Sequence, residues 1–262
     1  IKRKFKILSN FYFDKFMPYK RLRHFSIDRW IYKDEIKRYQ VYKTTDKYIN
    51  ISPDSNFFHP KWDCLVCSND KRKKLYRNYF PYDFSCMREF PNKYKLAYSS
   101  YFLQCIPQRF GELLLNQAHK ALTKDGILRI VLPDTDLAFQ AYIDKRIDFF
   151  EIISSRNSCY KDKEYYLELM LATFIAGKDI FDLSKDFDIA VEIRKAFYTM
   201  EKQDFLDYII EMVNLKSRLS KANLNWFNYN KLYKSMKKVG FSSVYQSGFG
   251  QSKSIVMRDI PI

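Results

Sequence analysis

A strand–helix–turn–strand pattern near the middle of the chain constrains the fold more than any other feature of the sequence. Residues 96–100 (LAYSS) form a short β-type run, and residues 108–122 carry apolar side chains at helical spacing. Residues 124–126 (KDG) end that helix, and residues 127–132 (ILRIVL) form a strand that Pro133 closes. A strand, a helix and a strand in so short a stretch imply a right-handed crossover and a parallel sheet.

The sequence extends this pattern on both sides. Residues 47–51 (KYINI) and 64–68 (CLVCS) are short, apolar runs that predict two further core strands, and residues 81–91 predict a loop. Later segments without internal Pro or Gly predict helices at 136–153, 165–176, 189–219 and 229–239, and an antiparallel hairpin from 241–245 and 254–257. The expected fold class is α/β, with a mostly parallel sheet, a C-terminal hairpin and a helical insertion.

The length and apolar content predict how the chain is divided. With 262 residues and 47% apolar content, it can bury one large α/β core, alone or with a small helical cap. We expect four parts: a basic, aromatic N-terminal arm at 1–45, the first part of the core at 46–150, a helical insertion at 151–224, and a helix and hairpin completing the core at 225–262.

The positive charge of the chain indicates an anionic partner. Its formal net charge is +16, and Lys and Arg gather early in the sequence. Nucleic acid, sugar phosphate, nucleotide sugar and a membrane surface all fit this charge. Basic residues are interspersed with Tyr32, Tyr39 and Tyr42, a pattern that would suit the stacking of nucleic-acid bases on the tyrosine rings. With 21 tyrosines in the chain, such spacing is also expected by chance. An anionic small molecule or glycan is therefore favoured over nucleic acid.

Several classes of protein are not favoured by the sequence. It has no run of 18 apolar residues and no signal-peptide core, so we expect a soluble, cytoplasmic protein without a membrane span. An odd number of cysteines, five, favours reduced thiols. Cys64 and Cys67 form a C-x-x-C pair, but no second pair follows, so no metal site is expected. The three scattered histidines and the missing phosphate loop argue against a hydrolase, a metalloprotease or a kinase.

The central segments resemble a known family. The turn at residues 98–101 (YSSY), the helix that follows, the KDG turn and Pro133-Asp134 are similar to the central part of class I S-adenosylmethionine-dependent methyltransferases. Residues 225–244 (NWFNYNKLYKSMKKVGFSSV) resemble the family's last helix and turn. More narrowly, the resemblance is to a small bacterial branch associated with surface polysaccharides, and it covers roughly residues 48–254. It implies a Rossmann-like fold that binds S-adenosylmethionine at the carboxyl ends of the strands.

The resemblance also implies a set of site residues. The first strand and its loop would contact the cofactor, an acid after the second strand would bind the ribose, and a later Asp and Phe would hold the adenine. The expected cofactor-binding residues are Asn50, Ser52, Asp54, Asp70, Asp83, Phe84 and Ser99. Tyr101 and Gln104 stand where the family has catalytic side chains. The expected substrate-binding residues are Trp226 and Tyr229, as an aromatic platform, and Gln251 and Ser252, in a Gly- and Ser-rich segment.

The sequence departs from the family at the pocket, and two functions stay open. Residues 1–110 contain no glycine, and the Gly-x-Gly pair of the first loop is replaced by Ser52 and Asp54. The family's His-x-x-Glu-His pattern reads Tyr101, Gln104 and Cys105. One interpretation is a methyltransferase acting on a sugar or phosphorylated precursor of capsule or lipopolysaccharide. The other is an inactive pseudo-methyltransferase that serves as scaffold or partner, in a homo- or hetero-oligomer with an active paralogue.

Overall fold

The computed structural model describes residues 47–51, 62–66, 78–81, 90–153, 166–177, 187–216, 223–248, 251–254 and 257. The N-terminal arm expected at residues 1–45 lies outside these ranges.

A parallel sheet forms the first layer of the fold. Its five strands stand in the order β3-β2-β1-β4-β5, and every neighbouring pair is parallel. This is the strand order of Rossmann-like nucleotide-binding folds. The strands predicted near residues 47, 64, 96 and 127 are confirmed, whereas β3 was not predicted as a strand. The bounds are β1 Lys47–Ile51, β2 Asp63–Val66, β3 Asn78–Pro81, β4 Tyr94–Ser100 and β5 Leu122–Val131.

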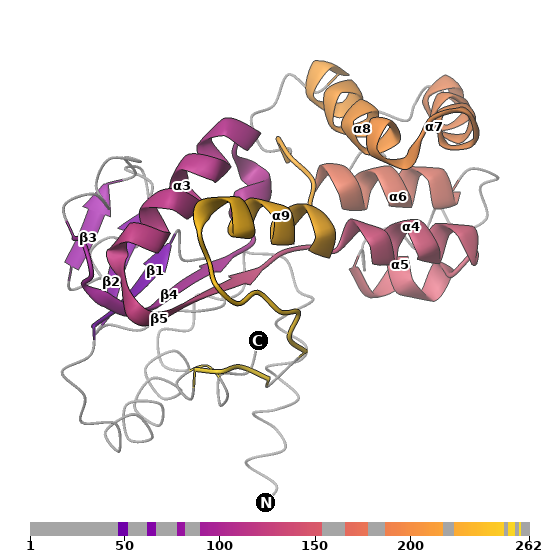
Figure 1. The fold of residues 1–262 in the computed structure, drawn as a ribbon. Coiled ribbons are helices and arrows are strands. Elements are labelled where there is room, and N and C mark those ends of the chain that lie inside the picture. Colours follow the sequence, from indigo (N-terminus) through magenta and orange to yellow (C-terminus); the bar gives the residue numbers. More distant parts are fainter. Residues whose placement is uncertain are drawn as a thin grey trace, which may run out of the picture.

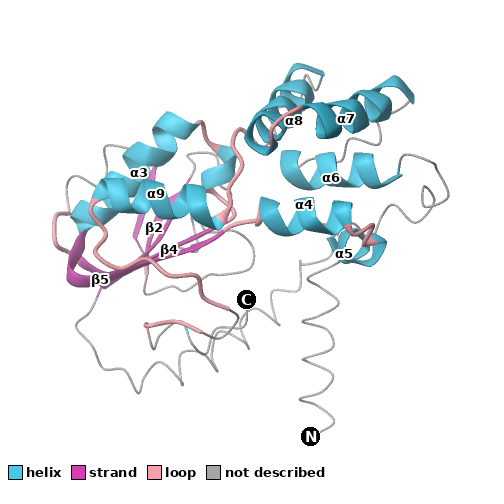
Figure 2. Ribbon diagram, turned by 45° about the vertical axis from the view of Figure 1, so that its right-hand side comes forward, coloured by secondary structure: helices cyan, strands magenta, loops and turns pink. Residues whose placement is uncertain are grey.

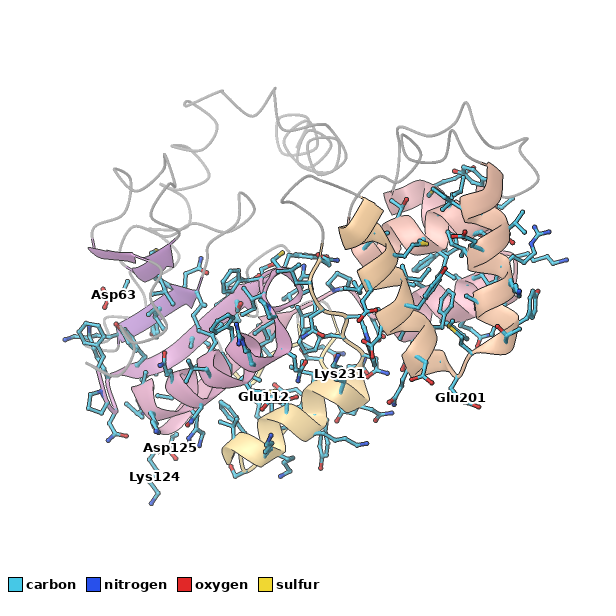
Figure 3. The ribbon with its side chains drawn as sticks, turned by 90° about the horizontal axis from the view of Figure 1, so that it is seen from above. Asp63, Glu112, Lys124, Asp125, Glu201 and Lys231 are labelled. Atoms are coloured by element: carbon cyan, nitrogen blue, oxygen red, sulfur yellow. The ribbon has the colours of Figure 1, made fainter. Side chains whose placement is uncertain are left out.

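The crossover between β4 and β5 is the helix α3 (Gln108–Ala121). It ends earlier than the KDG turn predicts, because β5 begins directly at Leu122. The turn is instead a bulge inside β5, where the register with β4 shifts between Leu122 and Ile127. A Cβ at Gly126 would lie 2.9 Å from the Thr123 carbonyl oxygen, so this bulge requires glycine. Lys124 and Asp125 point away from the protein there (Figure 3).

Two helices cover one face of the sheet. The helix α9 (Tyr229–Val239) packs beside α3 (Figures 1 and 2). The Asn228 side chain accepts a hydrogen bond from the Lys231 amide at 2.8 Å and begins the helix, and Gly240, with φ 113°, ends it as predicted. The core between these helices and the sheet includes Ile49, Ile51, Leu65, Ala97, Leu114, Leu115, Ala118 and Phe227.

A second layer of five helices follows the sheet, and we call it the helical layer. It begins where β5 ends, so it lies beyond the carboxyl ends of β4 and β5 (Figure 1). The helix predicted at 136–153 is divided by Lys145, whose φ is 54°, and the one predicted at 189–219 is divided at Met200 and Glu201. The bounds are α4 Thr135–Ile143, α5 Ile147–Ile153, α6 Tyr166–Ala176, α7 Phe187–Thr199 and α8 Lys202–Lys216. This layer has a core of its own, which includes Phe150, Leu171, Ile193, Phe205, Leu206 and Trp226.

The C-terminal segment corrects one prediction. The described residues 241–248 and 251–254 contain no strand, so the expected antiparallel hairpin is not shown. The segment instead runs along the sheet face opposite α3 (Figure 1), where Met257 packs with Trp62, Leu96 and Tyr98. Of the helices that the structure describes, none has the length and apolar character needed to cross a bilayer.

Candidate functional site

The strand order places a switch point between β1 and β4. From β1 the chain moves to β2 and β3 on one side, then returns to form β4 and β5 on the other. In open parallel sheets, ligands bind at the carboxyl ends of the strands where the order reverses in this way. The carboxyl ends of β1 and β4 are therefore the candidate site of this fold.

Asn50 and Ser99 lie at this switch point, as the sequence predicts for residues at the ends of two core strands. Ser99 stands beside Ile51 and Asn50 stands beside Tyr98 in the β1–β4 ladder, so their side chains point to opposite faces of the sheet. Asn50 is 1% exposed and Ser99 is 3% exposed. The Ser99 hydroxyl has no hydrogen-bond partner among the described residues. An unpartnered buried hydroxyl is costly and marks a place for a polar ligand atom.

The loop after β4 brings Tyr101 and Gln104 to the same end of the sheet. Tyr101 has φ 50°, and its amide donates to the Val131 carbonyl oxygen at 2.9 Å, which fixes the loop to the end of β5. A residue other than glycine in this region carries backbone strain, which is concentrated at functional sites. Gln104 lies in the 3-10 turn η3 (Leu103–Cys105), is buried, and its Oε1 has no partner among the described residues. Ser99, Tyr101 and Gln104 thus lie at the same end of the sheet.

The loop after β4 provides no charged acid or base group, and its one thiol is Cys105. Desolvation of its sulfur raises the pKa of the Cys105 thiol, although part of the residue is exposed, so the thiol stays protonated at neutral pH. Residues 101–107 (YFLQCIP) contain no Asp, Glu, His, Lys or Arg. The loop can position and hydrogen-bond a ligand, and it offers no charged base of its own.

Two of the expected substrate residues lie next to the helical layer. Trp226 is 5% exposed and packs in the core of the helical layer, and its Nε1 donates to Asp207 Oδ1 at 2.6 Å. The Lys231 ammonium lies 3.8 Å from the centre of the Trp226 ring, so it covers one face of that ring. Burial lowers the pKa of Lys231, opposed by the nearby Asp207 carboxylate. Tyr229 is half-buried, and its ring lies 5.8 Å from that of Tyr233.

The other two expected substrate residues lie elsewhere. Gln251 and Ser252 belong to the C-terminal segment on the face opposite α3, whereas Tyr229 is on α9, on the α3 face. The Gln251 carbonyl oxygen accepts from Arg129 Nη1 at 3.1 Å, and Ser252 Oγ accepts from the Ser254 amide at 3.1 Å. The predicted substrate set is therefore divided between the two faces of the sheet.

Sequence reasoning missed Arg129. It is 8% exposed on β5, and a charged residue inside the run ILRIVL is the signal that could have found it.

Among the described residues no three His, Cys, Asp or Glu side chains are grouped as metal ligands would be. Of the expected cofactor residues, Ser52, Asp54, Asp70, Asp83 and Phe84 lie outside the described residues.

No protein-family model matches the sequence, and no curated protein matches it. Among solved structures, the chain is similar to a phosphoethanolamine N-methyltransferase 2 of Haemonchus contortus, solved with phosphomonomethylethanolamine and S-adenosylhomocysteine, at 15% identity and a TM-score of 0.26. The match covers 71% of this chain and 48% of that enzyme, so this chain spans about half of its length. The fold assignment rests on the strand order of the chain itself.

Proposed function

We propose that this chain is an S-adenosylmethionine-dependent methyltransferase-like protein that binds the methyl donor at the carboxyl ends of β1 and β4. The observation that carries the proposal is the buried Ser99 hydroxyl, which has no partner in the described part of the chain, at the switch point of a 3-2-1-4-5 parallel sheet. The sequence resemblance around residues 98–134 supports the same class.

The residues of the edge suit positioning rather than proton transfer. The donor supplies an activated methyl group on a sulfonium, so in-line alignment of the acceptor provides much of the rate. In the proposal, Ser99 and Gln104 hold the polar end of the donor through the two atoms that lack partners. The exposed Tyr101 side chain lies where an acceptor would approach. An acceptor that is already ionised needs no base, which favours a sugar phosphate or another phosphorylated precursor of a bacterial surface polysaccharide.

Calorimetry with S-adenosylmethionine and S-adenosylhomocysteine tests the proposal. We expect micromolar binding to the full chain, and Ser99→Ala should weaken it by roughly five- to tenfold, the cost of one lost hydrogen bond. Ser235→Ala is the matched control, because the Ser235 hydroxyl donates to the Lys231 carbonyl oxygen on α9, away from the switch point. Equal binding by both variants, or no binding by the wild-type chain, would contradict the proposed site.

A second function is favoured by the composition of the same loop. Tyr101, Gln104 and Cys105 stand where the family has His, Glu and His, and Ser52-Pro53-Asp54 replaces its first glycine pair. These changes suit a catalytically inactive methyltransferase-like scaffold, in a complex with an active paralogue. Under this alternative, neither ligand gives a heat of binding at high concentration, and the chain raises the methyl-transfer rate of the paralogue when the two are mixed.

A further inference from the structure

Arg129 is a buried cation that forms no ion pair with the residues that the structure describes. The residue is 8% exposed, and no carboxylate in the described part of the chain pairs with its guanidinium. Its Nε is buried and has no hydrogen-bond partner within the ranges that the structure describes. An arginine stays charged at every physiological pH, and a buried charge is strongly unfavourable unless it is paired. This position therefore calls for an anion that the described residues do not supply.

The surroundings of Arg129 are apolar and enclosed. On the sheet face opposite α3, Arg129 of β5 stands beside Tyr98 of β4, which stands beside Asn50 of β1. Tyr98 is 3% exposed, and the neighbouring core on this face contains Met257 and Leu96. Because water is largely excluded, an ionic contact made here is stronger than one made at the surface.

A neutral carbonyl now accepts the hydrogen bond of Arg129. Arg129 Nη1 donates to the Gln251 carbonyl oxygen at 3.1 Å. The turn around Gln251 holds its own shape, because the Gln251 amide donates to the Gly248 carbonyl oxygen and Gln251 Oε1 accepts from the Gly248 amide. Arg129 thus connects a closed turn to the sheet through one uncharged acceptor.

We propose that Arg129, beneath the turn of residues 248 and 251–254, is the binding residue of a site for a small oxyanion group, a phosphate or a carboxylate. A charged oxygen is a stronger acceptor for guanidinium than an amide carbonyl, and the anion binds at the Nε edge of the guanidinium, which the Gln251 carbonyl on Nη1 does not occupy. The Nε and Nη2 donors of that edge form the planar fork that binds two oxygens of one group, as Arg146 does with the Asp148 carboxylate. Ser252 and the buried Ser254 bring hydroxyl donors from the same segment.

This site is distinct from the proposed donor site. The Ser99 side chain points to the α3 face, whereas Arg129 lies in the row of Tyr98, on the opposite face. The inference needs no methyl donor and stands if the proposed methyltransferase activity fails.

Titration of the full chain with inorganic phosphate and with acetate tests the inference. Binding is measured by calorimetry at constant ionic strength, with sodium chloride replacing each anion in the reference. We expect saturable binding of at least one of the two probes, and the tighter of them identifies the class of oxyanion. Arg129→Lys keeps the charge but loses the fork, and it should weaken binding by about tenfold. Arg129→Gln should abolish it.

The control is Arg146→Gln, which removes an exposed arginine that pairs with Asp148 at 2.6 Å. It should bind the anion as the wild-type chain does. If Arg129→Gln does not fold, Arg129→Lys and the wild-type titration decide the question. Absence of saturable binding by the wild-type chain, or equal loss in Arg146→Gln and Arg129→Lys, would overturn the inference.

Discussion

At the residue scale, the buried carboxylates Asp63 and Glu168 differ from Arg129 in having a partner of opposite charge among the described residues. Glu168 is 3% exposed in the helical layer, and its Oε1 accepts from Tyr142 and from Arg194, both at 2.7 Å. Asp63 is 7% exposed and accepts from Lys93 and from the Tyr94 hydroxyl, both at 2.8 Å. Burial, followed by the Asp63 contact, raises the pKa of Tyr94, which therefore acts as a hydrogen-bond donor throughout the physiological range.

Removing the Glu168 carboxylate should cost a large part of the stability. Glu168→Ala leaves the Tyr142 hydroxyl and the Arg194 guanidinium without their acceptor, and we expect a loss of about 3 kcal/mol in the free energy of unfolding. Glu168→Gln keeps an acceptor oxygen and should lose about half as much. Urea unfolding followed by circular dichroism measures both. Equal midpoints for the Ala variant and the wild-type chain would show that the contacts contribute nothing.

Asp136 should make stability depend on acid pH. Burial alone would raise its pKa, but the Lys202 ammonium at 2.6 Å and the Asn228 amide outweigh burial, so its pKa lies below its ordinary 3.8. Because the pKa of Asp136 is lower in the folded chain than in the unfolded chain, the carboxylate stabilises the fold fully at pH values above its unfolded-state pKa. This stabilisation is lost as the pH falls through the folded-state pKa.

The test compares Asp136→Asn with the wild-type chain from neutral pH to pH 3. The wild-type chain should lose more stability in the acid part of the range, by less than about 1 kcal/mol because the pair is partly exposed. Lys202→Met should show the same flattened profile. Parallel profiles for all three chains would mean that the pair does not form in solution.

At the scale of elements, Gly177 and Gly111 differ in whether the structure has room for a Cβ. Gly177 follows α6 with φ 62°, and a Cβ there would lie 2.5 Å from Asn223 Nδ2. Asn223 satisfies the end of α6, since its amide donates to the Ala176 carbonyl oxygen and Nδ2 donates to that of Ile175. Gly111 lies inside α3, and a Cβ there would make an ordinary 3.7 Å contact with Leu103.

The two Gly→Ala substitutions should therefore change stability in opposite directions. Gly177→Ala should lower the midpoint of thermal unfolding, at a cost of about 2 kcal/mol from backbone strain and the displaced Asn223. Gly111→Ala should stabilise the chain by roughly 0.5–1 kcal/mol, because alanine favours the helix and limits the unfolded chain. Differential scanning calorimetry decides, and a rise in both midpoints would contradict the geometry at Gly177.

Local sequence signals predicted most elements but not every boundary. The strand at residues 47–51 and the helix at 229–239 match their predicted bounds, because short β-branched runs and Asn and Gly caps act locally. The division between α7 and α8 has no such signal, because no Pro or Gly marks Met200 and Glu201. It follows from packing, which buries Ile193 and Ala196 on one side and Phe205 and Leu206 on the other within a single core.

At the scale of the whole molecule, two neighbouring residues connect two cores. Trp226 packs into the helical layer, and Phe227 packs between α9 and the sheet. The amide of Leu224 donates to the Gln104 carbonyl oxygen at 2.7 Å, and the Phe227 carbonyl oxygen accepts from the Thr135 amide at 3.1 Å. The switch-point loop is thus attached to the segment between the helical layer and α9.

This connection predicts that the two cores unfold together. Trp62, 3% exposed, reports on the sheet, and Trp226 reports on the helical layer. In a Trp30→Phe background, Trp62→Phe and Trp226→Phe each leave one indole. For each variant, the urea midpoint measured by fluorescence should equal the urea midpoint measured by circular dichroism. Two separate midpoints within one variant would show that the helical layer opens on its own.

The candidate site was predictable only in part, for a reason of geometry. Asn50 and Ser99 could be placed because the ends of neighbouring parallel strands meet at one edge. The burial of Trp226 depends on Asp207 and Lys231, from two helices that no local pattern brings together. The contact between Arg129 and Gln251 joins residues 122 positions apart through a turn without regular structure, so its partner was not readable from the sequence.

The hydrogen bonds between Thr135 and Phe227 join the two ends of a long excursion of the chain. Where the two ends of a long excursion already touch, the excursion can be shortened, enlarged or exchanged while the remaining scaffold keeps its path. A brief glycine-rich bridge between those two positions would leave the strand ladder uninterrupted. We therefore expect the sheet and the two helices packed on it to keep their path when such a bridge replaces the helical layer.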